Sequence, residues 1–207
     1  MSRRTDKKAA SCEYFDRRAP TYETGRRWQR LREPQAKAVA MLDLNPNDRL
    51  LDVGCGTGAA VRHAAQLVTR AVGVDLSPKM IEQARELAEG FANVEFRIGD
   101  SEHLPFLDGE FSAVLCTSSL HHYPNPERAV KEIARVLASG GRLALGDINR
   151  DGRFMRAIDY LGRRFEPGHV GMRSSADFGR YLDEACLTPV ASHRLWRGHF
   201  LIVLARK

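Results

Sequence analysis

The chain has 207 residues, of which 43% are hydrophobic and 28% are charged, and its formal net charge is +6. This length supports one α/β domain with a sizeable core, and the composition excludes a disordered or fibrous protein. No run approaches the ~18 apolar residues of a membrane span. The basic N-terminus lacks the apolar core of a secretory signal. We therefore expect a cytoplasmic protein without a transmembrane segment.

The positive charge lies in an N-terminal arm. Residues 1–32 hold ten Lys or Arg and four Asp or Glu, and the remaining residues are neutral in sum. Two interpretations stay open: a solvated tail, or an arm whose arginines meet an anionic substrate or surface. Residues 1–11 are expected to be disordered. The chain has no aromatic-interleaved basic patch beyond the arm, which disfavours a nucleic-acid partner.

Residues 50–58 combine a buried strand with a glycine turn, and residues 59–68 follow as an amphipathic helix. The strand is apolar at Leu50, Leu51 and Val53, and the turn contains Gly54, Gly56 and Gly58. Strand, glycine turn and helix form the first unit of a doubly wound α/β sheet, which binds ligands at the carboxyl ends of its strands. The pattern Gly54-x-Gly56-x-x-Ala59 also fits the loose dinucleotide fingerprint, so NAD is an alternative.

Acidic residues follow the next two predicted strands. Residues 71–75 end at Asp75, where a carboxylate can accept both ribose hydroxyls of an adenosine. Residues 94–98 are followed by Gly99, Asp100 and Ser101, and Asp100 can accept a hydrogen bond from the adenine amine. The regular spacing of these strand ends is the strongest signal in the chain.

The second half predicts two more parallel strands and a closing hairpin. Residues 113–116 and 142–147 are the strands, joined by a helix that begins at Asn125-Pro126. Residues 149–173 are either a substrate lid or a structural helix. Ser174-x-x-Asp177 is a capping box for the last helix. Residues 190–206 form a hairpin, so one of its two strands must be antiparallel to the rest of the sheet. A dinucleotide oxidoreductase would be expected to continue with further βαβ units.

The four cysteines, Cys12, Cys55, Cys116 and Cys186, contain no CxxC pair. We therefore expect neither a zinc site nor disulfides, and we interpret Cys55 and Cys116 as buried, inert thiols.

Several motifs resemble those of class I S-adenosylmethionine (SAM)-dependent methyltransferases. They are Asp52-Val-Gly-Cys-Gly-Thr-Gly58, Asp75-Leu-Ser-Pro-Lys-Met80 and the stretch from Gly99 to Phe106. The string Phe15-Asp-x-x-Ala19-x-x-Tyr22 resembles the N-terminal signature of the ubiquinone/menaquinone biosynthesis (methyltransferase type 11) group. The resemblance implies a Rossmann-like, doubly wound, seven-stranded sheet, mostly parallel with a C-terminal antiparallel hairpin strand. It also implies SAM as cofactor and S-adenosylhomocysteine as product.

The same resemblance gives a set of cofactor-binding residues: Tyr22, Asp52, Gly54, Cys55, Gly56, Gly58, Asp75, Leu76, Met80, Asp100, Ser101 and Thr117. Two of them keep a second interpretation. Tyr22 either approaches the methionine end of SAM or anchors the arm, and Met80 either packs on adenine or belongs to the helix core.

His121 and His122 lie on the loop after the fourth strand, where a general base would be useful, and we place His121 ahead of His122. A hydrogen-bonded structural role is the alternative. Because the sulfonium methyl is already activated, much of the acceleration can come from positioning, and a base is optional.

These observations predict a methyltransferase that transfers a methyl group to a small-molecule acceptor by in-line displacement. The chain lacks Asn-Pro-Pro-Tyr and a cysteine nucleophile motif, which disfavours DNA and pyrimidine targets. The alternatives are a tRNA or protein methyltransferase that uses the basic arm, a noncatalytic SAM-binding protein, and an NAD enzyme. We expect one domain over 1–207, a monomer or homodimer, with an arm (1–43), a SAM-binding core (44–148) and a region for the lid, last helix and hairpin (149–207).

Overall fold

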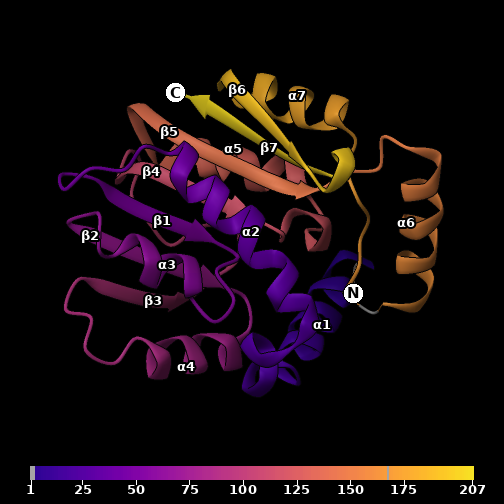
Figure 1. Ribbon diagram of the computed structural model, residues 1–207, viewed down its shortest axis with the longest axis horizontal. Helices are drawn as coiled ribbons and strands as arrows, with labels where there is room; N and C mark the ends of the chain where they lie inside the picture. Colours follow the sequence, from indigo (N-terminus) through magenta and orange to yellow (C-terminus); the bar gives the residue numbers. More distant parts are fainter. Residues whose placement is uncertain (1–2, 167) are drawn as a thin grey trace.

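The computed structural model describes residues 3–166 and 168–207 and has three layers, with a sheet between two groups of helices (Figure 1). Within these residues the strands are β1 (Arg49–Val53), β2 (Arg70–Asp75), β3 (Val94–Ile98), β4 (Phe111–Thr117), β5 (Leu137–Ile148), β6 (Thr188–Leu195) and β7 (Phe200–Arg206). They form a seven-stranded sheet in the order β3-β2-β1-β4-β5-β7-β6. Strands β1 to β5 pair in parallel, and β7 is antiparallel to β5 and β6. The predicted fold class is confirmed.

The helices are α1 (Arg3–Asp16), α2 (Arg26–Met41), α3 (Ala59–Ala64), α4 (Pro78–Leu87), α5 (Pro126–Val136), α6 (Arg153–Phe165) and α7 (Ser175–Glu184). Short 3-10 helices are η1 (Ala19–Thr24), η2 (Leu120–His122) and η3 (Trp196–Gly198). Helices α2, α3 and α4 pack on one face of the sheet, and α5 and α7 pack on the other (Figure 1). Helix α1 lies where the parallel strands end, and α6 stands apart from the sheet (Figure 1).

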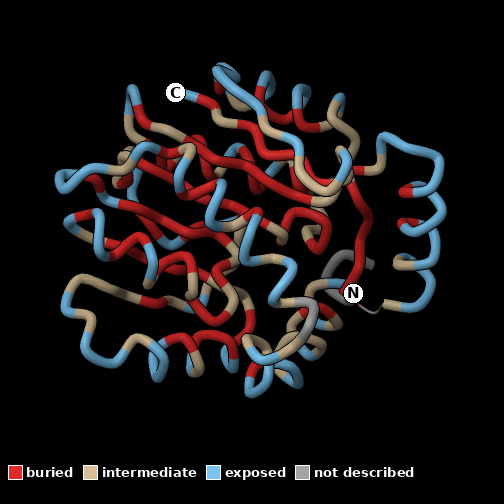
Figure 2. Tube along the Cα trace, in the orientation of Figure 1, coloured by how far each residue is buried: buried red, intermediate tan, exposed pale blue. Residues whose placement is uncertain are grey.

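The strands are apolar on both sides because helices cover both faces. Leu50 and Leu51 are both fully buried, although successive side chains of a strand point to opposite faces. Leu50 belongs to the cluster under α2 and α3, and Leu51 packs with Val72 and Val114 in the cluster under α5. Figure 2 shows the buried strands running through the centre of the molecule. This packing fixes the register that brings the strand ends together.

The N-terminal region differs from the sequence-based expectation. Residues 3–11, expected to be disordered, belong to helix α1, which runs from Arg3 to Asp16, while residues 1–2 lie outside the described part of the chain. The helix is held by polar contacts rather than by an apolar face: the ammonium of Lys8 contacts Asp100, and Asp16 accepts a bond from the Ser77 hydroxyl. A search for hydrophobic periodicity does not detect such a helix.

Helix α2 also begins earlier than expected. The sequence of residues 34–43 predicts a helix with Pro34 in its first turn, but α2 starts at Arg26 and contains Pro34 in its interior. Proline lacks one backbone donor and usually interrupts a helix. Here good helix formers precede Pro34, and the ring itself is buried, which offsets the missing bond.

Ser77-Pro78 in the sequence also predicts an N-cap followed by the first helical residue, and this capping signal and the other two are confirmed. The Ser77 side chain caps α4, the Asn125 side chain caps α5, and Ser174 and Asp177 form a complete capping box at α7. No helix within residues 3–166 and 168–207 is long and apolar enough to cross a membrane.

The glycine at the start of α3 provides a stability test. Gly58 has φ +79°, and a Cβ there would lie 2.4 Å from the Phe96 ring. We expect Gly58→Ala to lower the free energy of unfolding by about 2–4 kcal/mol, because it adds backbone strain and overpacking. Denaturant unfolding followed by circular dichroism measures the change.

The matched control is Gly179→Ala in α7, where no atom lies within 4 Å of the added Cβ. Alanine is the better helix former, so this variant should gain about 0.5–1 kcal/mol. Equal effects of the two substitutions would contradict the described packing of Gly58.

Candidate functional site

A pocket lies at the carboxyl ends of β1, β2, β3 and β4, beneath helix α1. It encloses about 730 Å³ of non-protein space, part of it open to solvent. Its described lining residues include Val53, Gly54, Gly56, Val74, Asp75, Leu76, Ser77, Met80, Gly99, Asp100, Ser101, Ser118, Ser119, His122, Tyr123 and Pro124, together with residues of α1 and η1.

The carboxylate of Asp75 joins the glycine loop to the start of α4. Its Oδ2 accepts the Gly56 N–H at 2.9 Å, and its Oδ1 accepts the Ser77 N–H at 2.9 Å. Burial raises the pKa of Asp75, and these backbone bonds oppose that rise. The carboxylate therefore has a fixed orientation at the base of the pocket.

The three glycines of the loop meet different needs. A Cβ on Gly54 would overlap Ser119 and the Tyr123 hydroxyl, and a Cβ on Gly58 would overlap Phe96. At Gly56 the nearest atom would be the Tyr22 ring at 3.7 Å. Gly54 and Gly58 are thus required by protein packing, whereas Gly56 leaves open space in the pocket.

Asp52 lies behind the pocket lining rather than in it. Its side chain is buried, and its Oδ2 has no hydrogen-bond partner within the described residues. Burial, together with the nearby charge of Asp75, raises the pKa of Asp52 to about 8. A positive or hydrogen-donating ligand group close to this carboxyl would lower the cost of ionising it.

Asp100 has a partner that the sequence interpretation did not include. Lys8 Nζ on α1 lies 2.6 Å from Asp100 Oδ2 and 2.8 Å from Glu102 Oε2. Burial opposes ionisation of Asp100, but the bond from Lys8 holds its pKa below the usual value. The ion pair of Lys8 with Asp100 also connects α1 to the end of β3.

Four residues of α1 line the pocket, namely Lys8, Ser11, Cys12 and Phe15. They follow the spacing i, i+3, i+4, i+7, which places them on one face of a helix. Because three of the four are polar or small, an analysis of apolar periodicity missed them. A search for any helical stripe at the N-terminus could have found them.

Aromatic rings close one side of the pocket. The Phe15 ring meets the edge of the His122 ring with centroids 4.8 Å apart, and it lies 6.4 Å from the Tyr22 ring. Tyr22 lines the pocket and also contacts Trp28 of α2, at 5.8 Å between centroids. Both interpretations of Tyr22, an anchor of the arm and a pocket residue, agree with its position.

The position of Met80 likewise agrees with both of its interpretations. Its side chain is 1% exposed and lies in the first turn of α4, yet it borders the pocket beside Leu76. The remaining predicted residues Cys55, Gly58 and Thr117 do not line the pocket; all three are buried. Burial raises the pKa of the Cys55 thiol well above its usual value and that of Cys116 to about 12, so both thiols stay protonated.

The two histidines differ in their access to the pocket. His122 lines it, and its Nδ1 donates to the Gly168 carbonyl at 2.8 Å. His121 lies behind it, with Nδ1 donating to Asp147 Oδ1 at 2.8 Å, and its buried Nε2 has no partner within the described residues. The two rings are 4.0 Å apart. The geometry therefore puts His122 ahead of His121 as a residue that can meet a ligand.

The pocket's chemistry suits an adenosine with a cationic tail. It offers two carboxylates, apolar side chains at Leu76 and Met80, and aromatic rings. Among its described lining residues Lys8 is the single Lys or Arg, and it is already paired with Asp100 and Glu102. Within that set no unpaired cation is available to a pyrophosphate, which favours a cationic sulfonium ligand over NAD. No group of His, Cys, Asp or Glu in the described part of the chain is arranged to hold a metal ion.

Comparison with known proteins agrees with this chemistry. Residues 51–145 match the family model of the methyltransferase domain. The matched segment of the chain therefore resembles a methyltransferase domain.

The matched proteins include two curated methyltransferases. The chain is 39% identical over 159 residues to 27-O-demethylrifamycin SV methyltransferase of Amycolatopsis mediterranei, covering 74% of this chain and 58% of that protein. It is 33% identical over 144 residues to demethylmenaquinone methyltransferase of Tropheryma whipplei, covering 70% and 60%. The chain thus spans about three fifths of the length of these relatives.

The solved structure of the YcgJ protein from Bacillus subtilis is similar to this chain, with a TM-score of 0.73 and 28% identity. The match covers 79% of this chain and 73% of that one. The resemblance inferred from the motifs is confirmed, because the matched family model and the curated relatives are methyltransferases.

The buried carboxyl of Asp52 predicts an unusual pH dependence. In the folded protein it keeps its proton up to about pH 8, whereas in the unfolded chain it ionises near its ordinary pKa of ~3.9. Folding therefore becomes less favourable as pH rises between these two values. We expect Asp52→Asn to raise the melting temperature of the ligand-free protein at pH 8 and to change it little at about pH 4.

Differential scanning fluorimetry across this pH range measures the difference. The control is Asp183→Asn, which alters an exposed carboxylate of α7. A melting-temperature gain for Asp52→Asn that is the same at both pH values would contradict the raised pKa.

Proposed function

We propose that the protein transfers a methyl group from SAM to a small-molecule acceptor by in-line displacement. The main support is the convergence of Gly56, Asp75, Met80 and Asp100 on one pocket at the strand ends. The relatives named for a demethylated rifamycin and for demethylmenaquinone support a small organic acceptor. The whole chain would act as one domain, with residues 1–43 covering the core of 44–148 and with residues 149–207 forming the lid, last helix and hairpin.

In this proposal Asp75 accepts the ribose hydroxyls with the lone pairs that Gly56 and Ser77 leave available. Leu76 and Met80 pack against the base, and Asp100 accepts from its amine. The other predicted cofactor-binding residues, Asp52, Cys55, Gly58 and Thr117, act from behind the lining, where they shape the glycine loop and the end of β4. Tyr22 and Ser101 contact the ligand directly.

When bound, the cofactor supplies a sulfonium-linked methyl group that is already electrophilic. The protein then has to orient the acceptor and exclude water, which can account for most of the rate. Phe15, Tyr22 and Tyr123 supply the nonpolar surface for this task, and their rings or hydroxyls border the pocket. Helix α1 covers this surface.

His122 is the proposed proton acceptor for an acceptor hydroxyl or amine. Its Nδ1 must donate to the Gly168 carbonyl, because a carbonyl only accepts, and so the neutral ring carries its lone pair on Nε2. His121 positions this ring: the two ring centroids lie 4.0 Å apart with their planes tilted by 43°, and His121 is itself held by Asp147 through both its ring and its backbone N–H. This assignment reverses the order expected from the sequence.

A tRNA or protein acceptor receives less support from the structure. Lys8 of the basic arm is paired inside the pocket, and α1 covers the cofactor region instead of extending from it. A noncatalytic SAM-binding protein would bind the cofactor without turnover, so activity distinguishes it.

Methyl transfer from labelled SAM to a panel of phenols, hydroquinones and amines tests the proposal. We expect one acceptor class to be labelled, and we expect His122→Gln to lower kcat about 100-fold or more while leaving S-adenosylhomocysteine affinity nearly unchanged. The reason is loss of the proton acceptor without loss of the adenosine contacts.

His63→Gln, on the exposed side of α3, is the control and should keep full activity. If His122→Gln kept wild-type kcat at every pH, the role of His122 would be wrong. If no member of the panel were labelled by a protein that binds SAM, the small-molecule proposal would fail.

A further inference from the structure

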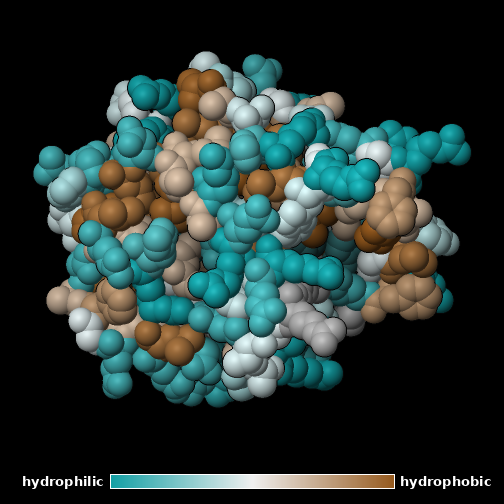
Figure 3. Space-filling view, viewed as in Figure 1, coloured by the Kyte–Doolittle hydropathy of each residue, from teal (hydrophilic) through white to brown (hydrophobic). Residues whose placement is uncertain are grey.

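Helix α6 carries an apolar stripe that the described chain leaves largely exposed, although the Phe154 ring contacts the His199 ring with centroids 6.3 Å apart. Phe154, Ile158, Leu161 and Phe165 are 67%, 36%, 52% and 74% exposed. Their spacing of four, three and four residues places them on one side of the helix. Figure 3 shows this stripe as brown surface along α6, at the edge of the molecule.

Four arginines, Arg153, Arg156, Arg163 and Arg164, belong to α6, and its acidic residue, Asp159, is buried. With about 3.6 residues per turn, Arg153 and Arg164 lie beside the stripe, whereas Arg156 and Arg163 lie toward the opposite side of the helix. Asp159 is also neutralised: Arg163 Nε lies 3.0 Å from its Oδ2, and His169 Nε2 donates to its Oδ1 at 2.8 Å. The exposed surface of the helix is therefore apolar and positively charged.

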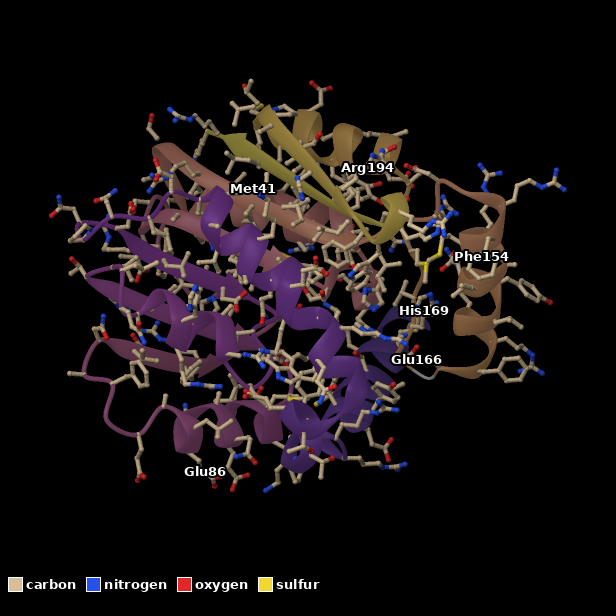
Figure 4. The ribbon with its side chains drawn as sticks, in the orientation of Figure 1. Met41, Glu86, Phe154, Glu166, His169 and Arg194 are labelled. Carbon is tan, nitrogen blue, oxygen red and sulfur yellow. The ribbon has the colours of Figure 1, made fainter. Side chains whose placement is uncertain are left out.

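The stripe is not what fastens α6 to the protein. The helix is held through its other side, where Asp159 accepts from His169 and from the Met172 N–H at 2.6 Å. A Cβ on Gly162 would lie 3.0 Å from the His169 ring, so this glycine permits the close approach. Figure 4 shows His169 between α6 and the body of the molecule, with Phe154 and Glu166 at the two ends of the helix. The exposed apolar stripe is therefore not explained by the attachment of α6 to the rest of the protein.

Size and charge limit what can cover the stripe. Its four side chains expose roughly 400 Å² together, about half of the ~800 Å² that each partner of a stable interface buries. A second copy of the chain placed against the stripe would also bring two sets of arginines together. An apolar stripe bordered by Arg153 and Arg164 instead matches an anionic lipid surface, where the apolar side chains enter the acyl boundary and these two arginines meet headgroups.

We propose that α6 is an interfacial helix that docks the protein on membranes containing anionic lipid. The helix adjoins the pocket wall: Tyr14 of α1 donates to Glu166, and the N–H groups of Val170 and Gly171 donate to the His121 carbonyl. Docking therefore places the pocket beside the lipid surface. The inference does not depend on which cofactor the pocket binds.

Co-sedimentation of the full chain with vesicles tests the proposal. The vesicles are phosphatidylcholine alone or phosphatidylcholine with about 30% phosphatidylglycerol, in low and high salt. We expect binding to the anionic vesicles at low salt, weakened at least about tenfold in the Phe154→Ser/Phe165→Ser variant and in the Arg153→Gln/Arg164→Gln variant. Pure phosphatidylcholine should bind little.

The matched controls change equivalent residues elsewhere. Leu107→Ser replaces a side chain that is 77% exposed in the loop before β4, and Arg30→Gln/Lys37→Gln removes two exposed charges of α2. Both should bind anionic vesicles as the wild type does, and all variants should keep the wild-type melting temperature because the altered side chains are exposed.

Three results would overturn the proposal: no binding of the wild type to anionic vesicles at low salt, equal loss in the controls, or unchanged binding in both α6 variants. Sedimentation velocity without lipid tests the alternative that a second copy of the chain covers the stripe. A wild-type dimer that dissociates in Phe154→Ser/Phe165→Ser would assign the stripe to a second copy instead. Binding of S-adenosylhomocysteine is measured separately, so failure of the membrane proposal leaves the proposed reaction standing.

Discussion

The two backbone bonds accepted by Asp75 determine the shape of the pocket. They join the glycine loop after β1 to the first turn of α4, and they do so at the end of β2, where the parallel register has already aligned the strand ends. Without this connection Gly56 and Ser77 would have no common partner. These bonds therefore fix how the glycine loop, which carries Gly54, faces the helix that carries Met80.

The N-terminal region completes the pocket by charge and not by apolar packing alone. Lys8 binds the carboxylates of Asp100 and Glu102, and Glu23 accepts bonds from Thr57 and Arg62 beside the glycine loop. These contacts connect α1 and η1 to the ends of β1 and β3. The basic arm thus covers the pocket, and its charge is in part structural.

Most of the central sheet was predictable because short-range rules govern it. The apolar strands, the caps at Ser77 and Asn125 and the acidic strand ends are all local patterns. Lys8 and the His121–Asp147 pair were not predictable, since their partners lie 92 and 26 residues away and become neighbours only through the topology. For the same reason, the sequence does not show which of His121 and His122 lines the pocket. The two residues are adjacent on one loop, yet their side chains have different surroundings.

The most direct test of the central claim is calorimetric titration of the protein with S-adenosylhomocysteine and with NAD, on the wild type and on Asp75→Ala. The account predicts micromolar binding of S-adenosylhomocysteine, about tenfold or greater loss in the variant, and no measurable binding of NAD. Circular dichroism of the variant confirms that it is folded. Preference for NAD, or undiminished binding of S-adenosylhomocysteine by folded Asp75→Ala, would contradict the account.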